Sequence, residues 1–285
     1  MVEITAAAVK ALRERTDLPM MECKKALVEA EGDQEQAVEI LKAQFKTILD
    51  KRANNPTEEG RIFFRASDDG GQAAMVEIQC ESAPVATSQA LSEFGDAMVS
   101  QLLNGPGADS PEALMSQIPD DADATLQTQF EELVNRIREK IMVNRVARVS
   151  GPVGGYVHHD GKTGVMFQAK GDSSGEILRY VAMHIAALRP AVTRPEELDD
   201  GLVQEERRRL TDEAKATGKP DNIIDRIVDG RMQNFFQEQG VLLSQLFAKD
   251  DSKTVEKTLS ESGLEAVGFH RWQVGDGNTP TASAG

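Results

Sequence analysis

The segment RIFFRASDDGGQAAMVEIQC, residues 61–80, determines the architecture that we expect for the central part of the chain. Two runs rich in β-forming residues, 61–66 and 72–80, flank an Asp-Asp-Gly-Gly sequence at 68–71. An Asp-Gly pair between such runs is a strong signal for a β-hairpin. Apolar residues then recur with helical spacing from 85 to 103. The segment therefore predicts a hairpin that packs on a helix, as in an α+β fold.

The same order of elements returns later in the chain. An Asp-Gly pair at 160–161 lies 91 positions after the pair at 69–70, within a predicted hairpin tip at 158–162. A strand pattern at 164–170 and a helical pattern at 175–188 follow it. We interpret this recurrence as a diverged duplication. It predicts a core of two α+β halves, each a hairpin or meander packed on helices, at 60–145 and at 146–195 with 244–278.

The remaining core elements follow from periodicity and from turn residues. We expect a loop at 104–123, helices at 125–142 and 253–259, and a last strand at 265–274. Two helical stripes within 196–243, joined by Gly218-Lys219-Pro220, predict an antiparallel helical hairpin inserted into the second half. The small polar residues at 279–285 predict a disordered tail.

Residues 1–52 predict a separate bundle of three short helices. Thr5 is a suitable N-cap for the first helix, Gly32 suits a left-handed C-terminal position, and Asp33 can cap the third helix. Cys23 falls on the inner face of the second helix, where it would act as a small buried hydrophobe. Met20 and Met21 begin that helix and cannot both face inward, so one of them is expected to form an adaptable apolar contact surface. Residues 54–60 have the composition of a linker.

Composition excludes several classes of function. The 285 residues carry 32 Lys and Arg against 47 Asp and Glu, a net charge of −15, which argues against nucleic-acid binding because phosphates are neutralised by an excess of basic side chains. Two cysteines exclude a disulfide framework and a structural zinc site. The residues at the N-terminus have the pattern of neither a signal peptide nor a transit peptide, so we expect neither, and no apolar run approaches membrane-spanning length. We therefore expect a soluble cytoplasmic protein.

A search for reactive motifs finds none of catalytic type. No glycine-rich phosphate loop is present, and the glycine-rich stretch at 151–155 contains a proline and leads into a strand. His158 and His159 are expected to be exposed at the hairpin tip and to point apart, His184 to be a satisfied core histidine, and His270 to be structural. The acidic pairs at 199–200 and 250–251 suit caps or turns. No metal or cofactor is expected, so the residues favour a binding or regulatory protein over an enzyme.

Several motifs then match one family in order along nearly the whole chain. They are Ile4-Thr5, Val9-Lys10 and Leu12-Arg13; Met20-Met21 with Cys23-Lys24-Lys25-Ala26-Leu27; Gly32-Asp33; Ala182-Met183-His184-Ile185-Ala186-Ala187; Ile227-Val228 with Gly230-Arg231; and Gly268-Phe269-His270-Arg271. The sequence resembles bacterial elongation factor Ts.

That resemblance implies a UBA-like N-terminal bundle and a guanine-nucleotide exchange factor that binds elongation factor Tu. It implies contacts with the GTPase domain and a further domain of that partner, with no nucleotide, nucleic acid or membrane bound directly. The residues at partner-binding positions are Arg13, Met20, Met21, Lys24, Ser82, Ala83, Pro84, Val85, Ile137 and His158.

The chain departs from the family at two places. After the cysteine of the first core strand the family carries Thr-Asp-Phe-Val, whereas Cys80 is followed here by a glutamate and then Ser82-Ala83-Pro84-Val85. Pro84 either merely starts the next helix or acts as a smaller wedge in place of the phenylalanine. The family's Gly-Glu-Asn turn is Arg-Glu-Lys at 138–140. An adaptor or chaperone of elongation factor Tu without exchange activity, or a weakly active paralogue, is therefore the alternative function.

Overall fold

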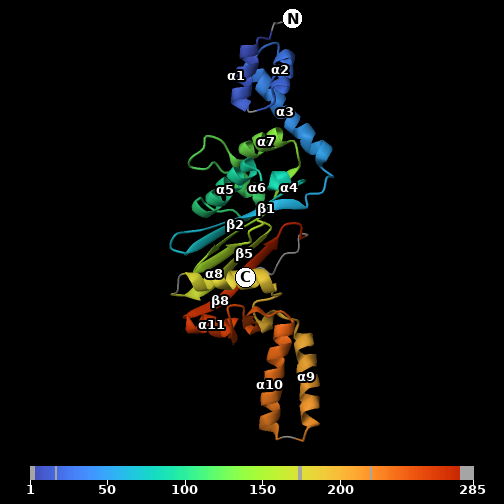
Figure 1. The fold of residues 1–285 in the computed structure, drawn as a ribbon, viewed down its shortest axis with the longest axis vertical. Helices are drawn as coiled ribbons and strands as arrows, with labels where there is room; N and C mark the ends of the chain where they lie inside the picture. The colour runs from blue at the N-terminus through green and yellow to red at the C-terminus, as the bar shows by residue number, and fades with distance from the viewer. Residues whose placement is uncertain (1–3, 17, 173–174, 219, 277–285) are drawn as a thin grey trace. The chain divides into compact units, whose positions relative to one another are not determined.

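The computed structural model describes residues 4–16, 18–172, 175–218 and 220–276 and has an α+β fold (Figure 1). Its residues form two compact units. Unit 1 comprises Met1–Phe63 and Ala74–Arg148, and unit 2 comprises Phe64–Ala73 and Val149–Gly285, as far as they are described. The predictions for Lys219 and for a disordered tail at 279–285 lie outside the described residues.

The N-terminal bundle of unit 1 contains helices α1 (Ala6–Thr16), α2 (Met20–Glu29) and α3 (Gln34–Arg52). The predicted end signals are confirmed. Thr5 Oγ1 accepts a hydrogen bond from the Ala8 N–H at 3.2 Å, and Asp33 Oδ1 accepts from the first turn of α3. Gly32 has a φ of 94° and its N–H closes α2 on the Leu27 carbonyl at 2.8 Å. The small bundle core is buried around Leu12, Cys23 and Leu27.

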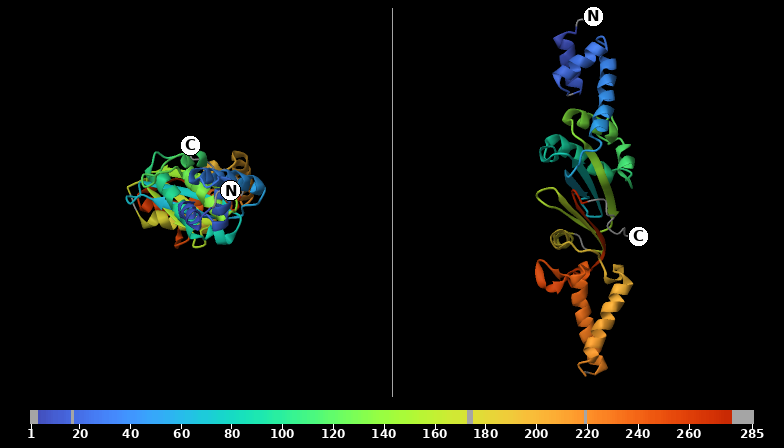
Figure 2. Two further views of the ribbon diagram at one scale, coloured as in Figure 1. Left: turned by 90° about the horizontal axis from the view of Figure 1, so that it is seen from above. Right: turned by 90° about the vertical axis from the view of Figure 1, so that its right-hand side faces the viewer.

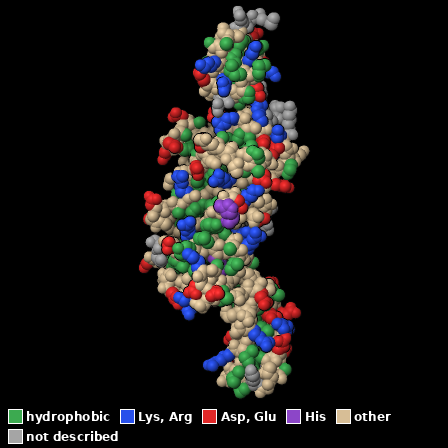
Figure 3. Space-filling view, viewed as in Figure 1, with side chains coloured by type: hydrophobic (Ala, Val, Ile, Leu, Met, Phe, Trp, Pro, Cys, Tyr) green, Lys and Arg blue, Asp and Glu red, His purple; other side chains and the backbone are tan. Residues whose placement is uncertain are grey.

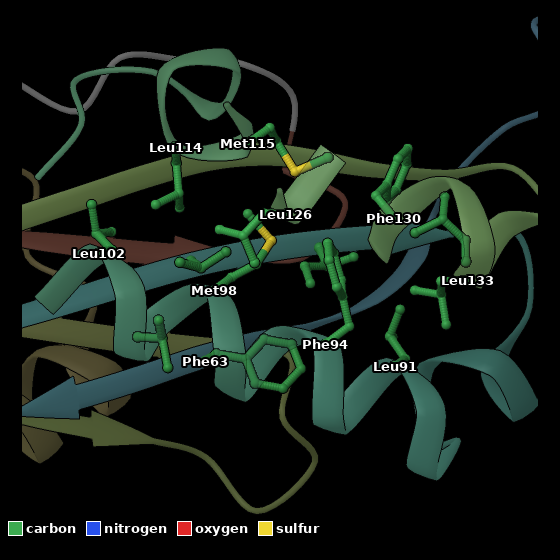
Figure 4. Packing of buried hydrophobic residues seen from close by; sticks show 14 of the residues in the cluster. Phe63, Leu91, Phe94, Met98, Leu102, Leu114, Met115, Leu126, Phe130 and Leu133 are labelled. Atoms are coloured by element: carbon green, nitrogen blue, oxygen red, sulfur yellow. The ribbon is translucent and has the colours of Figure 1, made fainter. Parts of the chain in front are cut away.

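The remaining helices of unit 1 pack on a three-stranded sheet in the order β1-β2-β3, whose hairpin end at 64–73 and last residues at 149–150 are counted with unit 2. The elements of this part are β1 (Glu59–Ala66), β2 (Gln72–Cys80), α4 (Ala83–Ala86), α5 (Gln89–Asn104), α6 (Pro111–Met115), α7 (Leu126–Ile137) and β3 (Ile141–Ser150). Figure 4 shows how apolar side chains of α5, α6 and α7 meet those of the sheet. The rings of Phe94 and Phe130 lie 5.8 Å apart at their centroids, so α5 and α7 share this core.

Unit 2 contains a second three-stranded sheet with the corresponding order, β4-β5-β8. The strands of this sheet are β4 (Val153–Val157), β5 (Thr163–Gly171) and β8 (Leu264–Gln273), and the helices are α8 (Glu176–Leu188) and α11 (Val255–Glu261). The short strands β6 (Leu246–Phe247) and β7 (Asp250–Thr254) pair with each other as a separate two-stranded sheet. In both sheets a hairpin is joined by a strand that follows intervening helices. The hairpin glycines Gly70 and Gly161 have matching φ values of 67° and 72°. These correspondences support the interpretation of a duplicated core.

Two long helices of unit 2, α9 (Asp200–Lys215) and α10 (Asp221–Glu238), lie side by side as an antiparallel pair (Figure 2). Short 3-10 turns, Pro195–Glu197 and Leu242–Ser244, precede and follow the pair. Its apolar stripe forms a core of its own around Leu210, Val228 and Met232. Asp199 caps α9 by accepting from the Leu202 N–H at 2.9 Å. No described helix is long and apolar enough to cross a membrane.

The helix expected at 85–103 is instead two helices. Ser88 interrupts it, because its side chain caps α5 by accepting from the Leu91 N–H at 3.2 Å. The loop expected at 104–123 contains α6, which begins where Ser110 caps a turn that starts with Pro111. Both corrections come from serine caps, which periodicity alone does not reveal.

The predicted end of the helix expected at 125–142 is also wrong. It stops at Ile137 because Arg138 adopts a left-handed conformation with a φ of 66°, and β3 begins at Ile141. The helix expected at 253–259 begins instead at Val255, since Thr254 ends β7 and caps α11 through its hydroxyl. In both cases helical periodicity continued into a neighbouring strand, where it no longer applies.

Candidate functional site

The exposed face of α2 carries an apolar strip beside basic side chains. Met20 is 45% exposed, Met21 63% and Val28 57%, and Lys24 lies between them on the same face. This arrangement follows from helical spacing, because residues i, i+4 and i+8 share a face. The opposite face of α2, with Cys23, Ala26 and Leu27, is buried. We call Met20, Met21, Lys24 and Val28 the α2 face.

The structure exposes both methionines, whereas the sequence predicted one. Sequence reasoning also missed Val28, although its spacing of eight residues from Met20 was a usable signal. Arg13 is exposed as well, on α1. Cys23 is fully buried, as predicted, with its thiol 3.6 Å from the Leu18 carbonyl that it donates to. Among the residues that the structure describes, the apolar side chains of the α2 face are therefore exposed rather than packed against the bundle core.

The segment that departs from the family forms a single helical turn, α4. Ala83 and Pro84 are exposed on it, and Pro84 occupies its first turn, where a missing N–H is tolerated. Val85 is half-buried, and so is Ile137 at the end of α7; both pack against the unit 1 core. The turn thus exposes Ala83 and Pro84, while Val85 and Ile137 pack against the apolar core beside it.

A set of side chains joins the root of the α4 turn to the segment that follows α7. The Ser82 hydroxyl donates to both carboxylate oxygens of Glu139, at 2.8 and 2.9 Å. The Glu81 carboxylate accepts from Arg52 at 2.8 Å and from the backbone N–H of Lys140. Sequence reasoning named Ser82 but missed both glutamates, because their partners are 57 to 59 residues away along the chain.

These contacts alter two ionisable groups. Burial by itself would raise the pKa of the Glu81 carboxyl, but the hydrogen bonds from Lys140, Arg52 and Asn55 outweigh it and hold that pKa below its ordinary value. Burial also raises the pKa of the Cys80 thiol to about 11. Cys80 is therefore a neutral thiol near neutral pH, and Glu81 is a carboxylate.

The hairpin tip in unit 2 places two histidines side by side. The prediction that His158 and His159 point apart is wrong: their ring centroids lie 4.2 Å from each other. β4 ends at Val157, so the alternation of a strand no longer applies to them. His158 is half-buried rather than exposed, and its Nδ1 lies 2.9 Å from the Tyr156 hydroxyl, while His159 is exposed.

The other histidines have structural surroundings. His184 is 1% exposed; its Nδ1 accepts from the Ala248 N–H at 3.2 Å, so Nε2 carries the proton that is donated to Gln245 at 2.9 Å. Its burial and the partners of both ring nitrogens confirm the prediction of a satisfied core histidine, and burial lowers its pKa. His270 lies in β8 with its ring edge-on to Trp272.

The glycine-rich stretch at 151–155 serves close packing. A Cβ on Gly154 would overlap the backbone of Leu178, so a glycine allows α8 to approach β4. Asp250 accepts from Ser252, a turn role like the cap made by Asp199. Within the described ranges no group of three or more His, Cys, Asp and Glu side chains could hold a metal ion. On the face shown in Figure 3, basic side chains are scattered among acidic ones and form no continuous basic patch.

Comparison with known proteins gives a consistent result. The family model described as "Elongation factor TS" matches residues 84–276. The chain is 38% identical to "Elongation factor Ts" of Hyphomonas neptunium and 39% identical to that of Thiobacillus denitrificans, in each case over 97% of this chain and 94% of the relative. It is 35% identical to the protein of the same name from Aquifex aeolicus, over 94% of this chain and 96% of the relative.

The fold and the α2 face define an α+β protein with a helical N-terminal bundle and an exposed apolar strip. The chain belongs to the elongation factor Ts family. It is therefore a translation elongation factor.

Proposed function

We propose that this elongation factor binds elongation factor Tu and promotes the release of GDP from it. The α2 face carries the proposal: two methionines and a valine, each about half exposed, lie on one face of a helix whose opposite face is buried. Methionine side chains adapt well to a partner surface. In the family resemblance, Arg13, Met20, Met21 and Lys24 fall at docking positions on the GTPase domain of that partner.

The proposed mechanism is thermodynamic linkage rather than bond-making chemistry, so the protein would not be an enzyme in that sense. A factor that binds the nucleotide-free partner more tightly than the GDP-bound one must weaken GDP binding by the same ratio. Each tenfold loss of nucleotide affinity requires about 1.4 kcal/mol of differential binding. The α4 turn and His158 would supply contacts made only in the distorted partner, and the factor itself would need no cofactor.

The net charge of −15 suits this role. A factor that acts in the cytoplasm beside RNA-rich translation machinery gains from a surface that is repelled by phosphates, since RNA is bound by excess positive charge. Its contacts with a protein partner do not depend on such charge. We therefore propose a protein partner and no nucleic acid.

A binding-only adaptor is the second candidate, and one observation favours it. The α4 turn exposes Ala83 and Pro84, where the family carries an aspartate and a phenylalanine. Ala83 and Pro84 are smaller than those residues and would make fewer contacts with the partner. Exchange is driven by contacts made only when the nucleotide site of the partner is distorted, so fewer contacts there favour binding without exchange. The adaptor would use the same α2 face to dock.

One experiment separates these functions. Release of a fluorescent GDP analogue from the cognate elongation factor Tu is followed with substoichiometric amounts of the full chain, and binding is measured in parallel by calorimetry. Acceleration with turnover of the factor supports exchange. Binding without acceleration supports the adaptor, and absence of binding contradicts both.

A further inference from the structure

The α4 turn is held at its root by a reciprocal clamp between two chain segments. The side chain of Ser82 donates to the side chain of Glu139, and the backbone N–H of the next residue, Lys140, donates back to the side chain of Glu81. We call these four residues the root clamp. Each segment therefore both donates and accepts, which fixes their relative position in two directions.

The segment that carries Glu139 is itself held on both sides. On one side α7 closes at Arg138, whose N–H donates to the Val134 carbonyl at 2.8 Å. On the other side the Lys140 ammonium donates to the backbone carbonyls of Ala53 and Asn55, at 2.7 and 3.0 Å. The Glu139 carboxylate is thus attached to an anchored stretch of backbone.

Ser82 does not act as an ordinary helix cap. It occupies the N-cap position of α4 but makes no side-chain hydrogen bond to the turn. Its hydroxyl instead donates its hydrogen bond to the side chain of Glu139, which lies outside the turn. The hydroxyl therefore ties the turn to the rest of unit 1 and adds nothing to the helix itself.

The other end of the turn is held by packing. Ala86 is 4% exposed, and Val85 packs against the same apolar core. The two side chains between these anchors, on Ala83 and Pro84, are exposed. A turn held at both ends presents its exposed middle in one geometry, which lowers the ordering cost when a partner binds there.

We propose that Glu139 is a positioning residue that acts through Ser82 and orients the α4 turn for the nucleotide-release step. This inference rests on the proposed function, because it assigns the turn a task in exchange. The α2 face docks, and the clamped turn acts after docking. Loss of the Ser82–Glu139 hydrogen bond therefore lowers the saturating exchange rate and leaves the half-saturation concentration unchanged.

The test is a double-mutant cycle in the full chain. Ser82→Ala, Glu139→Ala and the double variant are compared in the GDP-release assay at saturating and subsaturating factor. Each is expected to reduce the saturating rate by about threefold to tenfold, the net effect of one hydrogen bond. The double variant should be no slower than either single variant, because both remove the same bond. Ser82→Thr keeps a hydroxyl and should restore the rate.

A readout in the free protein tests the clamp without the partner. The amides of Ala86 and Thr87 donate within the α4 turn, to Ser82 and Ala83, so their hydrogen–deuterium exchange reports its order. Faster exchange at these two amides is expected in both single variants, with a melting temperature lowered by no more than a few degrees, because each variant loses one hydrogen bond of the folded state. Ser252→Ala is the matched control, since its hydroxyl also donates to a carboxylate, that of Asp250 at 2.6 Å.

The outcomes are distinct. Three results overturn the inference and leave the proposed function standing. The first is additive effects of the two substitutions on the rate, and the second is a change in the half-saturation concentration alone. The third is GDP-release rates and amide exchange rates equal to those of the unsubstituted chain. An unsubstituted chain that does not accelerate GDP release overturns the proposed function, and the positioning role with it. A loss of rate with Ser252→Ala equal to that with Ser82→Ala also overturns the positioning role.

Discussion

The α2 face gives the sharpest prediction about docking. Replacing Met20 and Met21 together by alanine removes most of the exposed apolar surface at the start of α2. Full burial of a methionine side chain stabilises by about 1.5–3 kcal/mol. Their exposed fractions of 45% and 63% leave about one such side chain to be buried by a partner. The double variant should therefore lose about 2 kcal/mol of binding free energy, a weakening of about 30-fold in Kd.

The measurement is calorimetric titration of the nucleotide-free elongation factor Tu with each variant. Alanine favours helix, and both side chains are exposed, so the melting temperature of the double variant should match that of the unsubstituted chain. Met183→Ala is the matched control: this methionine of α8 is 38% exposed but lies outside the α2 face, and its loss should leave Kd unchanged. Binding by the double variant within about threefold of the unsubstituted chain would refute docking through these methionines.

Three further predictions concern pH, a buried charge and the α4 turn. Burial holds the pKa of His184 below its ordinary 6.5. The unfolded state therefore binds a proton more readily as the pH falls below 6.5, and the free energy of unfolding declines. Urea unfolding at pH 7.5 and 5.5 should show this decline, and the decline should be smaller in the His184→Phe variant. Glu77 is fully buried and ion-paired with Arg145 at 2.5 Å. Replacement of Glu77 by alanine leaves the Arg145 charge without this partner and should lower the unfolding free energy by about 3–5 kcal/mol in urea titrations. A loss below about 1 kcal/mol would contradict this prediction. Ala83→Asp combined with Pro84→Phe should raise the GDP-release rate by enlarging the exposed turn, whereas an unchanged rate would locate the coupling elsewhere.

Local chemistry explains why much of the fold was readable in the sequence. The hairpin glycines, the caps at Thr5 and Asp33, and the left-handed Gly32 each depend on residues within a few positions, and all lie as expected. The recurrence at an offset of 91 residues predicted two similar halves, and both sheets have the corresponding strand order. His184 was recognisable because a histidine within an apolar helical stripe must be buried.

Errors arose where local patterns overlap. The apolar period of α7 continues into β3, so only the left-handed backbone of Arg138 separates helix from strand. The two histidines of the hairpin tip lie with their rings side by side, tilted by 57° to each other, because strand alternation ends just before them. Such boundaries depend on the geometry of the backbone, to which periodicity is insensitive.

Reading along the chain was enough to identify the family-like motifs, the acidic charge, and the positions of Met20, Met21 and Ala83-Pro84. It also identified most of the core helices and strands, but not α6 or the boundary between α7 and β3. The folded chain was needed to show that both methionines are exposed and that the α4 turn is hydrogen-bonded to Glu139. Sequence separation explains this difference. Caps, turns and helical faces form among neighbours along the chain, whereas exposure and the Ser82–Glu139 hydrogen bond depend on segments that meet only after folding.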